Sequence, residues 1–255
     1  MKIVAIIPAH LASVRFPRKI LHPIRGLPMI EHVRRRAQLC RGLDEVYVAT
    51  CDEEIATVVQ SHGGEVIPTS NTHTNGTSRV AEAAATLDCT HVILLQGDEP
   101  LLRPEHVESM IDAMRAADEA VAWNVTGPID EPDELDRHSF VKCIVGPAGR
   151  ILFCFRRSPC FSPFEVQRRF TRKILGIIGY RKPFLEELVA RPPSSLETAE
   201  FIEQMRIVEN GYFLKSVPVE QSLPSVNEPD EEREVLAQLE RDEGQKALLE
   251  RIARA

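Results

Sequence analysis

The sequence lacks several of the patterns by which common protein classes are recognised. Its six cysteines include no C-x-x-C pair, and no apolar run approaches the roughly 20 residues that a membrane-spanning helix needs. These absences argue against a thiol-ligated metal site and a membrane protein, and they favour buried, reduced thiols. The apolar start, MKIVAIIPAH, is interrupted too early for a secretory signal, so we expect a cytoplasmic protein.

A general surplus of basic residues is also absent. The formal net charge is −7, which argues against nucleic-acid binding, because proteins of that class usually carry a basic face. The basic residues are nevertheless uneven: seven Arg or Lys and a single acid, Glu31, lie between His10 and Arg36. This local surplus predicts a positive patch that attracts a small anionic ligand.

The chain contains no internal repeat and no low-complexity linker, and its first half alternates apolar runs with helical patterns. We predict strands at 2–7, 45–50, 65–70, 91–100 and 120–125, and helices at 28–40, 53–64, 78–87 and 104–117. Continuous Val, Ile and Leu runs are typical of strands that helices cover on both faces, so we expect an α/β fold with a doubly wound sheet. Such sheets bind ligands at the carboxyl ends of their strands.

The second half departs from this alternation. Residues 139–159 predict an antiparallel hairpin that turns at Gly146–Gly149 and lies outside the parallel core. Strands at 172–181 and 213–219, a helix from its cap at Ser195 to Gly211, and a charged helix from about Glu231 complete the prediction. Within the first of these helices, a three-residue repeat predicts a buried stripe that turns Glu203 and Gln204 away from its centre; its members are Leu196, Ala199, Ile202, Met205 and Val208.

The segment IIPAHLASVRFPRK, residues 6–19, carries unusual charge for a loop that leaves a strand. Arg15 and Lys19 stand four residues apart, Ser13 adds a hydroxyl donor, and Ala9 and Ala12 are small enough for a ligand to approach the backbone. Arg, Lys and backbone N–H groups together suit a triphosphate. Solvated loop charges are the alternative, and the segment is not a G-x-x-x-x-G-K loop.

Two further segments suggest ligand contacts. LLQGDEP places Asp98 directly beyond an apolar strand, where a carboxylate facing a phosphate loop is a natural Mg²⁺ ligand; alternatively, Asp98 caps the next turn. HTNGTSR places Asn75, Gly76 and Thr77 in a turn before a helix, where they can read the edge of a base. A simple helix cap by Thr77 is the other explanation.

These segments, in this order, resemble the 3-deoxy-manno-octulosonate (Kdo) cytidylyltransferases, also called CMP-Kdo synthetases. The family pattern I-I-P-A-R-x-x-S-x-R-x-P-x-K is similar to IIPAHLASVRFPRK. Collinear blocks extend the resemblance along nearly the whole chain, namely GLPMIEHV, VATCDEEI, HGGEVIPTS, HTNGTSRVAE, LLQGDEPLL, FVKCIV, LGIIGYRKPFLEEL and LETAEFIEQMRIVENG.

The resemblance implies a nucleotidyltransferase with a Rossmann-like mixed sheet of the nucleotide-diphospho-sugar transferase type, in which an acidic acceptor attacks the α-phosphate of CTP. It implies one domain over 1–255, with a small antiparallel subdomain at about 136–172 that forms a homodimer. Arg15, Lys19 and Asp98 would be catalytic, and Mg²⁺ would lie at Asp98 and the position of Asn227. The implied nucleotide-binding residues are Ala9, His10, Ser13, Arg15, Lys19, Asn75, Gly76, Thr77 and Arg79, and the implied acceptor-binding residues are Gln96, Lys142, Arg157, Glu203 and Gln204.

The chain departs from the family at three positions. His10 replaces an Arg, Ile174 replaces a His, and Asn227 replaces an Asp that helps to hold metal. A neutral amide is a weaker Mg²⁺ ligand than a carboxylate, although Glu228 stands next to it. The losses suggest a changed acceptor, either a Kdo-like 3-deoxy sugar acid or a phosphonate.

Two other functions remain open at this point. A catalytically weak CTP-binding homologue is the first. A metal-dependent glycosyltransferase is the second, and the absence of a D-x-D motif and the basic phosphate loop argue against it.

Overall fold

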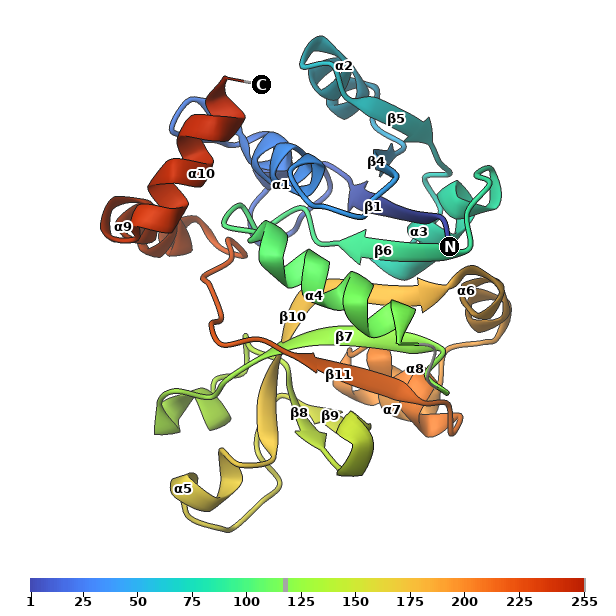
Figure 1. Ribbon diagram of the computed structural model, residues 1–255, viewed down its shortest axis with the longest axis vertical. Helices are drawn as coiled ribbons and strands as arrows, with labels where there is room; N and C mark the ends of the chain where they lie inside the picture. Colours follow the sequence, from blue (N-terminus) through green and yellow to red (C-terminus); the bar gives the residue numbers. More distant parts are fainter. Residues whose placement is uncertain (117–118, 255) are drawn as a thin grey trace. The chain divides into compact units, whose positions relative to one another are not determined.

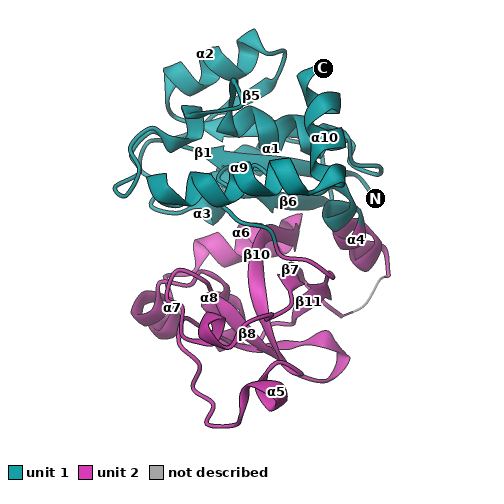
Figure 2. Cartoon of the chain, turned by 90° about the vertical axis from the view of Figure 1, so that its left-hand side faces the viewer, with its two compact units in different colours: residues 1–108, 223–255 teal, residues 109–222 magenta. Residues whose placement is uncertain are grey.

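A computed structural model describes residues 1–116 and 119–254. The chain forms two compact units, one of residues 1–108 with 223–255 and the other of residues 109–222 (Figure 2). The segment at about 136–172 lies within the second unit, and its role as an inserted subdomain of a single domain stays a prediction.

The first unit is built on four parallel strands in the order β6-β1-β4-β5, which are labelled in Figure 1. They are β1 (Ile3–Ala9), β4 (Glu45–Thr50), β5 (Glu65–Pro68) and β6 (His91–Leu95). The side chains of β6 are all buried, as are most of those of β1. This explains the continuous apolar runs, since helices pack on the sheet. A short antiparallel pair, β2 (Pro23–Ile24) and β3 (Leu27–Pro28), stands apart.

The helices of this unit confirm the predicted alternation. They are α1 (Met29–Gln38), α2 (Glu53–Ser61) and α3 (Gly76–Ala85), with α4 (Pro104–Arg115) running from the first unit into the second. α2 packs against β4 and β5, and α3 against β1. The predicted end of the fourth helix, Ala117, lies outside the described residues.

The second unit has a mixed sheet. Strand β7 (Ala122–Gly127) pairs in parallel with β11 (Leu214–Pro218) and antiparallel with β10 (Thr171–Arg181). The predicted hairpin is confirmed as β8 (Lys142–Val145) and β9 (Ile151–Phe155), which pair antiparallel, and β8 also pairs with β10. Helix α6 (Lys182–Ala190) was not predicted, and the remaining helices are the four-residue α5 (Phe164–Gln167) and the pair described next.

The predicted helix from Ser195 to Gly211 is wrong as a single element. It is two helices, α7 (Ser195–Glu200), which Ser194 caps, and α8 (Gln204–Glu209). Phe201, with a φ of 55°, adopts the left-handed conformation that ends α7. The break resets the helical phase, so the predicted stripe is also wrong: Leu196 is exposed, whereas Gln204 is buried.

The predicted C-terminal helix is likewise divided. Helix α9 (Glu232–Arg241) ends at Asp242, whose side chain accepts hydrogen bonds from Gly244 and Gln245 and so caps α10 (Glu243–Ala253). α10 lies beside α1 (Figure 1). Among the described residues, no helix is both long and apolar enough to cross a membrane.

Four of the six cysteines are buried, which agrees with the prediction of buried thiols. Burial raises the pKa of Cys40 to about 12, so this thiol stays protonated and unreactive near neutral pH. Cys51 is exposed.

Candidate nucleotide site

The loop that follows β1 is closed by its own backbone. The carbonyl of Leu11 accepts hydrogen bonds from the N–H groups of Ser13 at 2.9 Å and Arg18 at 3.1 Å. The Asp52 carboxylate accepts from the Leu11 N–H at 2.9 Å and ties the loop to the end of β4. Arg18 has a φ of 62°, an uncommon left-handed conformation that turns the chain just before Lys19. The loop is therefore folded so as to fix the position of Lys19.

Lys19 and Asp98 meet at the carboxyl edge of the sheet. The Lys19 Nζ lies 2.6 Å from Oδ2 of Asp98 and 3.4 Å from the carbonyl oxygen of Val226. The two side chains are only 12% and 21% exposed, so solvent screens their charges less than it screens a surface pair. The expectation that the basic loop and the polar end of β6 share one edge is confirmed.

Gly97 permits this approach. A Cβ at this position would lie 2.9 Å from Cδ1 of Ile20 and 3.3 Å from Cδ1 of Ile30, closer than packed atoms normally come. The turn after β6 therefore lies directly on the residue that follows Lys19. Gln96, a predicted acceptor contact, directly precedes this glycine in the sequence and is half-buried.

The segment before α9 joins the same group of residues. The Val226 N–H donates to the Asp98 carbonyl at 2.9 Å. Arg15, which is exposed, donates to Oδ1 of Asn227 at 3.5 Å and lies 3.6 Å from the Glu228 carboxylate. The structure thus brings Arg15, Lys19, Asp98 and Asn227 together.

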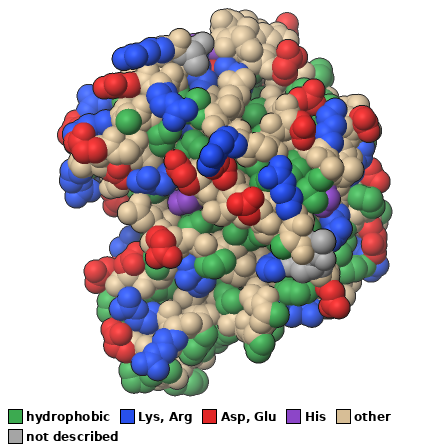
Figure 3. Space-filling model, viewed as in Figure 1, with side chains coloured by type: hydrophobic (Ala, Val, Ile, Leu, Met, Phe, Trp, Pro, Cys, Tyr) green, Lys and Arg blue, Asp and Glu red, His purple; other side chains and the backbone are tan. Residues whose placement is uncertain are grey.

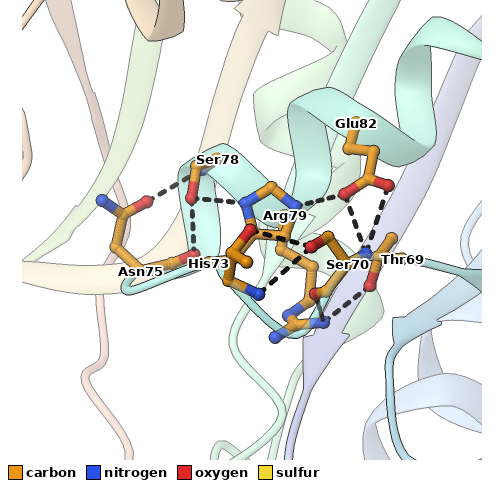
Figure 4. A network of polar contacts seen from close by, with 8 residues as sticks. Thr69, Ser70, His73, Asn75, Ser78, Arg79 and Glu82 are labelled. Carbon is orange, nitrogen blue, oxygen red and sulfur yellow. Dashed lines mark hydrogen bonds and ion pairs between the residues drawn. The ribbon is translucent and has the colours of Figure 1, made fainter.

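The turn before α3 lies beside the end of β1. A Cβ on Gly76 would be 3.2 Å from Cγ of Pro8, so the turn and the basic loop are neighbours. Asn75 caps α3, since its Oδ1 accepts from the Ser78 N–H at 2.8 Å; the predicted cap by Thr77 is wrong. Arg79 is buried, and its guanidinium donates to Oγ1 of Thr69 at 2.6 Å (Figure 4).

His10 lies among the charges of this edge. Desolvation lowers its pKa and the positive charge of Arg79 lowers it further, while Asp52 acts in the opposite direction. The imidazole is therefore mostly neutral near pH 7. Lys19 and Asp98 also act on it electrostatically, which places His10 near the ion pair.

Only some of the Arg and Lys residues between His10 and Arg36 lie on the surface. Arg34, Arg35 and Arg36 of α1 are buried. Arg34 and Arg35 pair with Glu31, which is itself buried, at 2.6 Å and 3.0 Å. On the face drawn in Figure 3, basic and acidic side chains are interspersed. The predicted patch is therefore wrong in extent, because these three arginines cannot meet a ligand from solvent.

Four predicted acceptor residues lie in the second unit. Lys142 is fully buried, and its Nζ donates to the carbonyls of Arg137 and Arg156. Its burial lowers its pKa to about 8. Gln204 is also buried, and its side chain donates to Oδ1 of Asn124 at 3.0 Å.

Arg157 and Glu203 are the other two. Arg157 is exposed, 4.0 Å from the Asp136 carboxylate, and Glu203 stands at the start of α8. For all four residues, contact with an acceptor stays a prediction.

The donor atoms fit Mg²⁺ held mainly by a nucleotide. No group of three or more His, Cys, Asp or Glu side chains suited to a metal occurs in the described part of the chain. Mg²⁺ needs no such cage, because it is commonly bound by one or two carboxylates together with phosphate oxygens and water. Asp98 can supply the carboxylate, and Oδ1 of Asn227 is a neutral oxygen close by.

Asp52 and the Val226 carbonyl are parts of the site that we did not predict. Asp52 follows the strand β4 within two residues, and the rule that polar residues after parallel strands meet at one edge would have found it. No comparable local signal marks Val226, which reaches the site from the far end of the chain.

Comparison with known proteins shows the family to which the chain belongs. A family model described as cytidylyltransferase matches residues 4–221. The 3-deoxy-manno-octulosonate cytidylyltransferase of Geotalea uraniireducens is 35% identical over 252 residues, covering 94% of this chain and 100% of the relative. The chain belongs to this cytidylyltransferase family. It is therefore an enzyme of the nucleotidyltransferase class, and the resemblance noted in the sequence is confirmed.

Other cytidylyltransferases agree with this placement. The 3-deoxy-manno-octulosonate cytidylyltransferase of Zea mays is 36% identical, covering 92% of this chain and 80% of the relative. Among solved structures, CMP:2-keto-3-deoxy-manno-octonic acid synthetase complexed with CTP matches with a TM-score of 0.88 and 34% identity, covering 95% of this chain and 100% of that one. The predicted α/β fold of this cytidylyltransferase family is confirmed.

Proposed function

We propose that the protein is a cytoplasmic, Mg²⁺-dependent cytidylyltransferase that joins CTP to a Kdo-like 3-deoxy sugar acid and releases pyrophosphate. The observation that carries the proposal is the meeting of Lys19 with Asp98, 2.6 Å apart, at the edge where the Arg15 loop and the Asn75 turn also lie. Relatives named as Kdo cytidylyltransferases support the acceptor class.

The proposed reaction needs positioning and positive charge more than covalent catalysis. Arg15 and Lys19 bind the triphosphate oxygens and offset the charge that develops on the leaving pyrophosphate. The acceptor oxygen forms a bond to the α-phosphorus, the bond from that phosphorus to the pyrophosphate oxygen breaks, and the proton of the acceptor hydroxyl passes to solvent water. Asp98 and Asn227 would hold Mg²⁺, which when bound polarises the α-phosphate.

The experiment is a pyrophosphate-release assay with CTP, Mg²⁺ and single acceptors. We expect release with Kdo or 8-amino-Kdo and none when the acceptor or Mg²⁺ is left out. Release with a small phosphonate alone would move the acceptor to that class. CTP binding without release for any acceptor would support a catalytically weak homologue and contradict our proposal.

We also propose a homodimer formed through the segment at about 136–172. Leu152, Phe161 and Val166 expose apolar side chains there, and exposed apolar groups of this size favour burial against a partner. Light scattering of the purified protein should give twice the mass of the chain, and a monomeric mass at micromolar concentration would refute the dimer.

His10 should make CTP affinity depend on pH. Its pKa is lowered in this structure, and a triphosphate next to the ring favours the charged form, so binding should raise this pKa. The resulting gain in affinity is fully present below the pKa of the free protein and is lost as pH rises through the pKa of the complex. We expect calorimetry between about pH 5.5 and pH 8 to show a steeper fall in affinity for wild type than for His10→Asn.

The phosphate groups of CTP also titrate in this range, but they do so equally with both proteins. The ratio of the two affinities therefore isolates His10. A ratio that is constant with pH would show that the imidazole does not meet the phosphates.

A further inference from the structure

The turn before α3 is held by a network of polar contacts that joins both of its ends to the helix (Figure 4). The Glu82 carboxylate accepts from the Ser70 N–H at 3.0 Å and contacts Nε2 of His73. Nδ1 of His73 lies 3.1 Å from Oγ of Ser78. Ser78 in turn donates its hydroxyl proton to the Asn75 carbonyl at 3.2 Å. The network therefore runs from Glu82 through His73 and Ser78 to Asn75.

The network decides which way the Asn75 amide faces. The Ser78 N–H can only donate, so the Asn75 atom that lies 2.8 Å from it must be the oxygen. The NH₂ group then points away from the helix, as Figure 4 shows. Within the described part of the chain this NH₂ has no hydrogen-bond partner. The turn thus presents two N–H donors next to the end of β1.

We propose that this fixed donor makes Asn75 the residue that selects cytosine over uracil. The two bases share O2 but differ at the next ring position: N3 of cytosine accepts a hydrogen bond, whereas N3 of uracil carries a proton and donates. A donor that faces N3 therefore bonds to cytosine and meets another donor in uracil. A polar group left unpaired in this way discriminates strongly between similar ligands.

His73 is the positioning residue of this arrangement. Its Nδ1 lies 3.1 Å from Oγ of Ser78, and its Nε2 contacts the Glu82 carboxylate. The hydrogen bond to His73 also lowers the pKa of Glu82, and the Ser70 N–H adds to this effect. The ring is therefore held between Glu82 and Ser78, and it keeps Ser78, and through it Asn75, in one orientation.

The inference rests on the proposed function, and a binding experiment separates the two. Dissociation constants for CTP and UTP are measured by calorimetry, without any acceptor. Asn75→Asp keeps an oxygen for the Ser78 N–H, since Asp caps helices as well as Asn does, but it replaces the donor with an acceptor. We expect its preference for CTP over UTP to fall at least tenfold relative to wild type.

Asn71→Asp is the matched control. It makes the same change of charge at an exposed position of the same turn, and we expect it to weaken both nucleotides equally. His73→Gln should lower the CTP preference by several fold, whereas a residue that merely stabilises the fold would change both affinities alike. Circular dichroism confirms folding of each variant.

The binding and release measurements together distinguish the inference from the proposed function. An equal preference of wild type for CTP and UTP, or an Asn75→Asp preference no different from that of Asn71→Asp, overturns the inference. A CTP preference that behaves as expected, in a protein that releases no pyrophosphate with any acceptor, supports the inference and refutes the proposed function. If wild type binds neither nucleotide, both are wrong.

Discussion

Lys19→Met is expected to lower kcat/KM for CTP by about 100-fold, or about 2.7 kcal/mol of transition-state stabilisation. The change removes the ammonium group that faces the triphosphate. It also leaves the Asp98 carboxylate, which Lys19 now neutralises at 2.6 Å, to repel the anionic substrate. Steady-state kinetics with varied CTP measures the effect.

Lys246→Met is the control for this prediction. Lys246 also forms an ion pair, with Glu243 at 2.5 Å, but it lies on α10 and its side chain is partly exposed. Its kcat/KM should stay within twofold of wild type. A similarly small effect for Lys19→Met, in a protein that remains folded, would remove Lys19 from the site.

Asp98→Asn is expected to lower activity by at least tenfold at limiting Mg²⁺ and to raise the Mg²⁺ concentration needed for half-maximal rate. An amide oxygen carries no charge and is a weaker ligand for Mg²⁺ than a carboxylate. The loss should be partly overcome at high Mg²⁺, because the metal can still bind through the phosphate oxygens. A titration of rate against Mg²⁺ concentration gives both quantities.

Asp112→Asn makes the same chemical change on the exposed surface of α4, where Asp112 lies 3.9 Å from Arg115. Its metal titration should coincide with that of wild type. If the curve for Asp98→Asn also coincides with wild type, the metal is not held by Asp98, and the assignment of this edge as the metal site is wrong.

The strand ends of the first unit could be predicted from the sequence because parallel strands bring their carboxyl ends to one edge. That single rule predicts that the loop of Lys19 and the turn of Asp98 lie at the same edge. The rule can be applied here because the strands are continuous apolar runs, so the sequence shows where each strand ends. The same rule applied to Asp52 would have added the residue that anchors the loop.

The wrong predictions concern the end of α7 and the exposure of the arginines of α1. In both cases the apolar periodicity of the sequence carries no information about the backbone conformation or the burial of the side chains. Phe201 adopts a left-handed conformation that favours glycine, so nothing in the apolar repeat marks the end of α7. The arginines of α1 read as a basic surface, but Glu31 lies three and four residues before two of them and is buried with them. Whether such a cluster faces solvent depends on α10, which packs against α1 from more than 200 residues away.

The hydrogen bond from the Lys19 ammonium to the Val226 carbonyl joins two distant parts of the chain. The Lys19 ammonium and its Val226 carbonyl partner are separated by 207 positions along the chain, and contacts of such long range form late in folding. A ribosome completes the basic loop long before it makes Val226. The edge that we propose for the triphosphate is therefore expected to become competent only after the segment around Val226 has been made and has docked.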